Sequence, residues 1–296
     1  MNQTHEILKR LADEPAWGYH AGDSAATEPT ALVACALRAG GFDDAATRAA
    51  AWLAATQTSD GSIGVRAGEP EPNWPTSLAV LAWRMTDPVR FADSIARAIQ
   101  RILSMHGEPV AQSAESGHDT TLVGWPWVAG THSWVEPTAL HVMALKATGY
   151  KSHPRVRSAV RLLNNRLLPD GGCNYGNTFV LGQMLRPHIQ PTGLALVALA
   201  DEPPGERQEK SRLTRSIKYL RQSLSAQTAA ASLAWGVLAL TAHGCRSAAA
   251  EDWLESAAQR TLRTGGSPHK LGLLALAALA PSDFLPPRTS HTRVDL

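Results

Sequence analysis

The stretch Glu28-Pro29-Thr30-Ala31-Leu32 recurs along the chain and decides its fold. The other copies are Trp74-Pro75-Thr76-Ser77-Leu78, Glu136-Pro137-Thr138-Ala139-Leu140 and Gln190-Pro191-Thr192-Gly193-Leu194. Proline suits the first turn of a helix, because the N–H that it lacks would have no partner there. A spacing of roughly 40 to 60 residues is the length of one helical hairpin with its loop. The repeat therefore predicts a series of helical hairpins.

Two kinds of helix are expected to alternate. Each copy opens a run that is apolar nearly all round, such as Leu140–Thr148, and two degenerate copies follow at Ala229–Thr241 and Lys270–Leu279. Amphipathic segments such as Val156–Leu168 lie between these runs. Helices that are apolar all round need neighbours on both sides. We therefore expect an all-α fold, a single α/α toroid of five to six helical hairpins over residues 1–280, and a flexible tail over residues 281–296.

The composition limits the class of partner. The formal charge of +2 gives no reason to expect nucleic acid, and the apolar run Leu271–Pro281 is too short to cross a membrane. Three cysteines are too few and too scattered for a disulfide scaffold. We therefore expect a cytoplasmic protein without a transmembrane segment.

Aromatic residues are concentrated in the loops that precede the apolar helices. In a closed ring these helices run parallel, so their preceding loops gather at one end. The predicted substrate-binding residues are Trp17, Tyr19, Trp74, Trp125, Trp127, His132, Trp134 and Tyr175. Aromatic faces at such a mouth can hold an apolar chain or stabilise a cation. The alternative is that the tryptophans simply pack the loops against the helix ends.

Several motifs resemble those of known toroidal proteins. The segment Gln57–Ile63 is similar to the Gln-x3-Gly-x-Trp repeat of squalene–hopene and oxidosqualene cyclases, with Ile63 in place of tryptophan. Leu167–Cys173 is a second copy, with Cys173 at that position, and Trp134–Thr138 resembles prenyltransferase/squalene-oxidase repeat proteins. The resemblance implies a terpene-cyclase-like toroid with an isoprenoid or similar apolar small molecule in its lumen.

The sequence lacks the catalytic motifs of this family. The cyclase motif Asp-x-Asp-Asp is absent, and the nearest match, Ser116–Thr121, places His118 where the cyclases have their protonating acid. Protein prenyltransferases bind zinc through Asp, Cys and His, and Asp170, Cys173 and His188 are the weak candidates for such a trio. No metal is favoured, and zinc is the minority alternative for the otherwise unknown cofactor.

Three residues are candidates for proton transfer: Glu136, His118 and Asp119. The alternative for Glu136 is structural, because a carboxylate at a helix N-terminus satisfies backbone N–H groups. Whether the chain is an enzyme stays open at this point. Besides the isoprenoid-binding protein, two functions remain: a non-catalytic module that binds a peptide or protein partner, and a zinc-dependent transferase of the prenyltransferase type.

Overall fold

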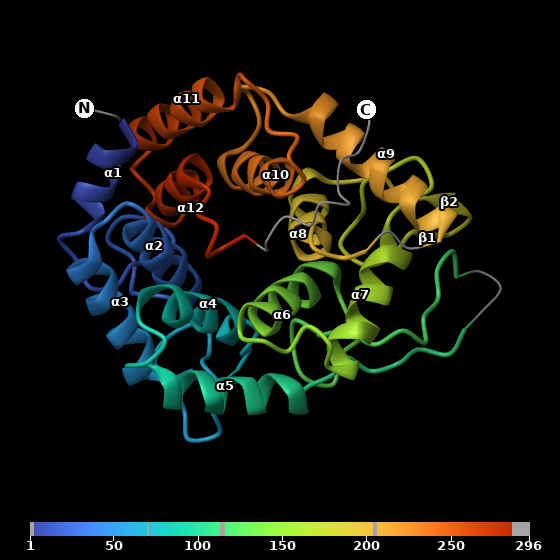
Figure 1. Cartoon of the computed structure of the whole chain (residues 1–296), viewed down its shortest axis with the longest axis horizontal. Helices are drawn as coiled ribbons and strands as arrows, with labels where there is room; N and C mark the ends of the chain where they lie inside the picture. The colour runs from blue at the N-terminus through green and yellow to red at the C-terminus, as the bar shows by residue number, and fades with distance from the viewer. Residues whose placement is uncertain (1–2, 70, 113–115, 204–205, 286–296) are drawn as a thin grey trace. The chain divides into compact units, whose positions relative to one another are not determined.

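The computed structural model describes residues 3–69, 71–112, 116–203 and 206–285. Within these residues there are twelve α-helices and one hairpin of two very short strands (Figure 1). The predicted all-α class is thereby confirmed. The described residues group into two compact units: those up to Ser104 with Ala226–Ala234 and Ala249–Phe284, and Met105–Ser225 with Trp235–Ala248 and Leu285. The helix α10 (Ala230–Ala242) has residues in both units.

The first unit is built around three helices that are buried nearly all round. These are α2 (Thr27–Ala39), α4 (Thr76–Thr86) and α12 (Pro268–Leu279), and α2 packs against both of the others. A Cβ on Gly272 would lie 2.5 Å from Cγ2 of Val33, so the glycine is what lets α12 approach α2 this closely. The half-exposed helices of the unit are α1 (Gln3–Leu11), α3 (Asp43–Thr56), α5 (Ala92–Ser104) and α11 (Ala250–Arg263).

The half-exposed helices show the expected amphipathic spacing. In α5 the buried side chains are Ser94, Ile95, Ala98, Ile99 and Ile102, which form one stripe at intervals of three and four residues. On the opposite side Asp93, Arg97 and Gln100 are exposed to water. Burial of this stripe, rather than intrinsic helix propensity, is what stabilises a helix of this length.

The second unit repeats the same arrangement. The buried helices are α6 (Val135–Ala147) and α8 (Ile189–Leu199), and the half-exposed ones are α7 (Pro154–Arg166) and α9 (Arg207–Ser223). Lys146 at the end of α6 contacts the carboxylates of Asp201 and Glu202 after α8, and all three side chains are nearly inaccessible to solvent. Because these charges are paired, their burial ties the ends of α6 and α8 together.

The recurring threonine has one structural role, which we call the threonine clamp. In the first unit Oγ1 of Thr30 accepts the backbone N–H of Trp17 at 3.0 Å and donates to the Trp17 carbonyl at 3.3 Å. Oγ1 of Thr76 makes the same two bonds with the backbone of Ile63, at 2.9 and 3.2 Å. In the second unit Thr138 holds Trp125 and Thr192 holds Cys173, each at 2.9 and 3.3 Å. All eight clamp residues are buried.

The clamp explains the Gln-x3-Gly-x-Trp resemblance. Ile63 and Cys173, which stand where the cyclase repeat has tryptophan, occupy the same structural position as Trp17 and Trp125. Each of the four residues offers its backbone to the threonine that opens the next buried helix. The position is therefore conserved within this chain as a backbone anchor, while its side chain varies.

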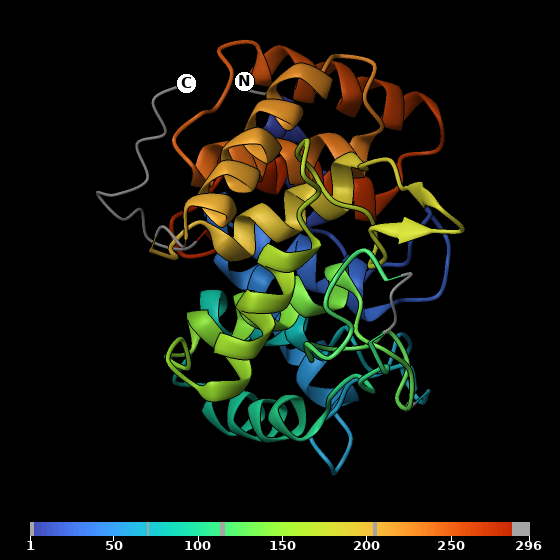
Figure 2. The ribbon, with the colours of Figure 1, turned by 90° about the vertical axis from the view of Figure 1, so that its right-hand side faces the viewer.

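Three parts of the structure differ from the sequence-based expectation. The chain begins with α1, which the sequence did not predict because its apolar side chains, Ile7, Leu8 and Leu11, are only a short stripe. The strands β1 (Phe179–Val180) and β2 (Gln183–Met184) form an antiparallel hairpin (Figure 2). Phe284 and Leu285, inside the predicted tail, are buried, and residues 286–296 lie outside the described part of the chain.

None of the helices among the described residues is long and apolar enough to cross a membrane.

Candidate functional site

A cavity of about 460 Å³ lies in the second unit between the loop that precedes α6 and the β1–β2 hairpin. It contains two of the residues that the sequence singled out, His118 and His132. The rest of its lining is Glu108, Val110, Ser116, Thr120, Leu122, Ser133, Arg166, Gly176, Asn177, Phe179, Val180 and Leu181. We call this space the His118 cavity. Its volume is in the range of small-molecule sites.

The His118 cavity contains a buried cation, Arg166. Its side chain is the last of α7, only 5% of the residue is exposed, and its Nη1 donates to the carbonyl of Asp119 at 3.0 Å and to Oδ1 of Asn165. Asn165 Oδ1 also accepts the N–H of Asp119 at 3.1 Å. The end of α7 thus holds the His118 loop in place. A cation is favoured there by the negative end of the helix dipole.

His118 is a neutral imidazole at ordinary pH. Burial lowers its pKa to about 4, and the positive charges of Arg166 and His132 add to this against a smaller opposite effect of Asp119. The N–H of Thr178 donates to Nδ1 of His118 at 3.4 Å, with the Thr178 hydroxyl also 3.1 Å away. Because Nδ1 accepts a backbone N–H, the neutral ring carries its proton on Nε2. His118 therefore offers an N–H donor at the cavity wall.

Some of the aromatic residues singled out in the sequence lie beside the cavity. The ring centroids of His132 and Trp134 are 4.5 Å apart, and those of Tyr175 and His188 are 5.1 Å apart. Gly176 lies against Trp134, where a Cβ would come within 3.1 Å of Cε3. His132, Trp134 and Tyr175 thus come from two loops of the same unit, while only His132 and Gly176 of these residues line the cavity itself.

The apolar wall of the cavity ends in a strained turn. Leu181 and Gly182, the two central residues of the β1–β2 hairpin, have φ angles of 49° and 78°, as in a type I′ turn. Glycine adopts this conformation freely, but leucine does so only at a cost of about 1–2 kcal/mol. Leu181 is also 97% exposed. A fully exposed apolar side chain held in an unfavourable backbone conformation points to a role in binding.

Glu136 and Asp119, the other candidates for proton transfer, do not line the cavity. Glu136 lies in the first turn of α6 and is 6% exposed, and its charge helps to raise the pKa of Cys173 and of Tyr175, although burial is the larger cause for both. The Asp119 carboxylate accepts the N–H and the hydroxyl of Thr121 at 2.9 and 2.6 Å, which lowers its pKa. Their catalytic roles remain predictions.

Trp125 and Trp127, from the same loop, have different surroundings. Trp125 is wholly buried, with its ring parallel to that of His141 at 5.2 Å and with the guanidinium of Arg155 4.6 Å from its ring centre. It therefore packs the loop against α6 and α7, and it does not line the His118 cavity. Trp127 is half-buried. A part in substrate binding stays a prediction for both.

The remaining predicted binding residues belong to the first unit. Trp17 is buried, and Trp74 is half-buried before α4. The Tyr19 hydroxyl donates to Oε2 of Glu28 at 2.7 Å, and Oε1 of that carboxylate lies 3.4 Å from Nε2 of His269. Burial and the charge of Glu28 raise the pKa of Tyr19. Glu28 is thus engaged on both oxygens by neighbouring side chains.

The residues of the zinc hypothesis do not assemble into a metal site. Cys173 is a buried clamp residue, His188 is exposed and donates its backbone N–H to Cys173 at 2.9 Å, and Asp170 is exposed in the preceding turn. Burial raises the pKa of the Cys173 thiol to about 12, which disfavours the thiolate that binds a metal. Across the described residues no group of three or more His, Cys, Asp or Glu side chains is arranged to hold a metal ion.

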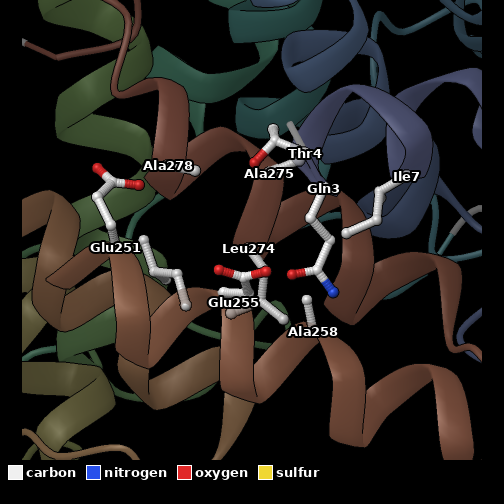
Figure 3. Close-up of a pocket in the computed structure, with 10 residues that line it drawn as sticks. Gln3, Thr4, Ile7, Glu251, Glu255, Ala258, Leu274, Ala275 and Ala278 are labelled. Atoms are coloured by element: carbon white, nitrogen blue, oxygen red, sulfur yellow. The ribbon is translucent and has the colours of Figure 1, made fainter. Parts of the chain in front are cut away.

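Two further hollows lie in the first unit. One of about 310 Å³ is lined by side chains of α1, α11 and α12, among them Gln3, Glu255 and Leu274 (Figure 3). Another of about 560 Å³ is bordered by Trp17, by the loop around His20 and by Gly265 and Gly266. Neither contains more than one of the predicted site residues. The His118 cavity is therefore the best-supported site.

The sequence missed Arg166 and the hairpin residues Phe179, Val180 and Leu181. Arg166 looks like an ordinary charged position near the end of an amphipathic helix, and only its burial in the fold distinguishes it. The hairpin is too short to show an alternating pattern. The one available signal was Gly182, since glycine inside a strand-like run is typical of a tight turn.

No protein-family model and no curated protein sequence matches this chain. Several solved structures, however, are similar to it in fold. A protein from Actinoplanes aligns over 94% of this chain and 99% of its own, with 16% identity and a TM-score of 0.58. A glycosidase aligns over 96% and 98% with 12% identity and a TM-score of 0.55, and Salmonella alpha-2-macroglobulin aligns over 93% of this chain and 17% of its own with 15% identity and a TM-score of 0.52.

This likeness shows the fold. The aligned glycosidases and the aligned 17% of alpha-2-macroglobulin are α/α toroids, and the chain is accordingly an all-α toroid of helical hairpins, as the repeat predicted. Identities this low show nothing of activity. These structural neighbours do not support membership of the prenyltransferase and terpene-cyclase group.

Proposed function

We propose that this chain is a toroid that binds a small molecule with an apolar body in the His118 cavity. The observation that carries the proposal is the cavity itself: a space of about 460 Å³ with an apolar wall on one side and hydrogen-bonding side chains on the other. Such a mixture is typical of ligand sites, where apolar contacts give affinity and a few polar groups fix the orientation. The isoprenoid predicted from the sequence is one member of this class.

Two further features support an apolar ligand body. Val110, Val180 and Leu181 line the cavity and are all exposed, and Met184 is exposed on the same hairpin. Exposed apolar side chains that gather at the rim of a cavity mark a binding site more often than a neutral surface. The strained Leu181 lies at the centre of this rim.

Proton transfer is the second candidate function, and His118 favours it. A half-buried imidazole whose Nε2–H lies at the cavity wall can donate that hydrogen to a basic atom of a bound molecule. A role for Glu136 or Asp119 in the same step is a weaker proposal, because neither residue lines the cavity. The alternative from the sequence, a non-catalytic module that binds a peptide or protein partner, differs from this enzyme both in its ligand and in lacking turnover.

The binding proposal is tested by filling the cavity. Leu122→Trp places a large ring in the wall, and Val89→Trp adds the same bulk at a site in the first unit that is 85% exposed. We expect geraniol or geranyl phosphate to bind the wild-type chain in calorimetric titrations. Leu122→Trp should weaken this binding at least tenfold, and Val89→Trp should leave it unchanged.

Other outcomes would favour other functions. One of the glycosidases was solved in complex with glucose, so glucose is titrated in parallel. Binding of glucose in place of the apolar compounds would contradict the proposal and favour a sugar ligand. If no compound binds and the two variants behave alike, the His118 cavity is not a small-molecule site.

A further inference from the structure

We propose that the ligand of the His118 cavity carries an acidic head group, a carboxylate or a phosphate, which is bound by the guanidinium of Arg166. This inference rests on the proposed function, because it assigns the chemistry of one end of the same ligand. The other end faces the apolar wall of Val110, Leu122 and Phe179. The cavity would thus bind an amphiphilic anion.

Arg166 places a buried positive charge at the cavity. Arg166 is 5% exposed, and of the five N–H donors in its guanidinium only Nη1 is engaged, by the Asp119 carbonyl and by Asn165. No carboxylate among the described residues comes within ion-pair distance of it. Burying a cation without an ion pair is costly, so an anion brought by the ligand would be stabilised by contact with it.

Other side chains that can donate hydrogen bonds line the cavity together with Arg166. Nδ1 of His118 accepts from Thr178, which leaves the Nε2–H of His118 as a donor on the cavity wall. His132, Ser116 and Ser133 line the same cavity. A planar guanidinium binds a carboxylate or phosphate through two parallel hydrogen bonds, and an imidazole N–H can add a third.

Two acidic side chains oppose this arrangement, but weakly. Glu108 lines the cavity and is exposed, so water and salt screen its charge. The Asp119 carboxylate is turned to Thr121 and contributes only the smaller, opposing effect on Arg166, whose pKa burial lowers to about 10. Arg166 therefore stays charged at neutral pH, and the inner part of the cavity is positive.

The test compares three ligands with one apolar body. Geranyl phosphate, geranic acid and geraniol are titrated calorimetrically into the wild-type chain, Arg166→Gln and Arg161→Gln. Arg161 is an exposed arginine on the same helix, α7, and serves as the matched control. We expect both acids to bind the wild-type chain at least tenfold more tightly than geraniol. Arg166→Gln should bring all three within twofold, and Arg161→Gln should keep the tenfold preference.

Each alternative result has a definite meaning. Equal binding of acids and alcohol to the wild-type chain overturns the acidic head group but leaves the proposed binding function standing. Absence of binding for all three ligands refutes the proposed function itself. Should Arg166→Gln fail to fold, Arg166→Lys retains the charge without the planar fork, and a tenfold preference that survives unchanged in this variant would also contradict recognition by the guanidinium.

Discussion

Two residues of the structure carry an energetic cost that a bound ligand could offset, one in its backbone conformation and one in its buried charge. Leu181 is the clearest case, because its positive φ and nearly complete exposure both count against leucine. Arg166 is a second, since its charge is buried at the end of α7. Both residues line the His118 cavity. The structure thus concentrates unfavourable features at the site where a ligand would compensate for them.

Replacing Leu181 by asparagine should separate stability from binding. Leu181→Asn gives the hairpin an Asn-Gly turn, which is preferred for two residues with positive φ. We expect the free energy of unfolding to rise by about 1 kcal/mol, because asparagine tolerates this conformation. Binding of geranyl phosphate should weaken several-fold. Urea unfolding and calorimetry measure the two effects.

The control for this prediction is Val89→Asn, which changes an exposed apolar residue without a positive φ. This variant should change neither stability nor binding by a measurable amount. A loss of stability in Leu181→Asn would show that the leucine is not strained, and unchanged affinity would show that the hairpin tip does not contact the ligand.

At the scale of the secondary-structure elements, the threonine clamp connects each buried helix to the loop that precedes it. In the second unit Thr138 holds Trp125, and the N–H of Trp134 donates to the same carbonyl at 3.1 Å. These bonds fix the start of α6 relative to the loop that carries His118 and His132. The clamp is therefore what positions the polar wall of the cavity.

Thr138→Val should destabilise the fold. The substitution keeps the shape of the side chain but removes the hydroxyl that accepts the buried N–H of Trp125, and loss of such a buried hydrogen bond costs about 1–3 kcal/mol. Thr131→Val is the control, because that hydroxyl lies at the surface and bonds only to the carbonyl of Val128. Thermal and urea unfolding of both variants measure the difference. Equal stabilities would contradict the structural role of the clamp.

For the whole molecule, stability should fall on acidification because of buried neutral histidines. Burial lowers the pKa of His141 to about 4, and it also lowers that of His243. Between the unfolded pKa of about 6.5 and the folded value, the unfolded chain binds more protons, so stability decreases as the pH falls through this window. His141 alone accounts for a loss of up to about 3 kcal/mol.

His141→Leu should flatten this dependence. Denaturant unfolding between pH 8 and pH 4 is expected to show a shallower decline for the variant than for the wild-type chain. The comparison at pH 8, where both are uncharged at this position, gives the cost of the substitution itself. Parallel curves for the two proteins would mean that His141 is accessible to protons in the folded state.

The sequence predicted the helices well and the site only in part, for physical reasons. Proline, threonine and apolar runs report local helix starts and burial, so the pairs from α2 to α9 were foreseeable. The tip of the β1–β2 hairpin has no such periodic signal. Cys173 resembled a zinc ligand, but its position is one of the clamp anchors. Arg166 lines the site because the loop that carries His118 packs on the end of α7, where Arg166 donates to the Asp119 carbonyl.

The most direct test of the account is the NMR signal of His118 during a titration with geranyl phosphate. His118 is one of eleven histidines and is assigned by comparison with His118→Asn. We expect the His118 signal to shift with ligand and the pKa of His118 to rise from about 4, because a bound anion stabilises the imidazolium. An unchanged His118 signal, at ligand concentrations where calorimetry shows binding, would contradict the assignment of this cavity as the functional site.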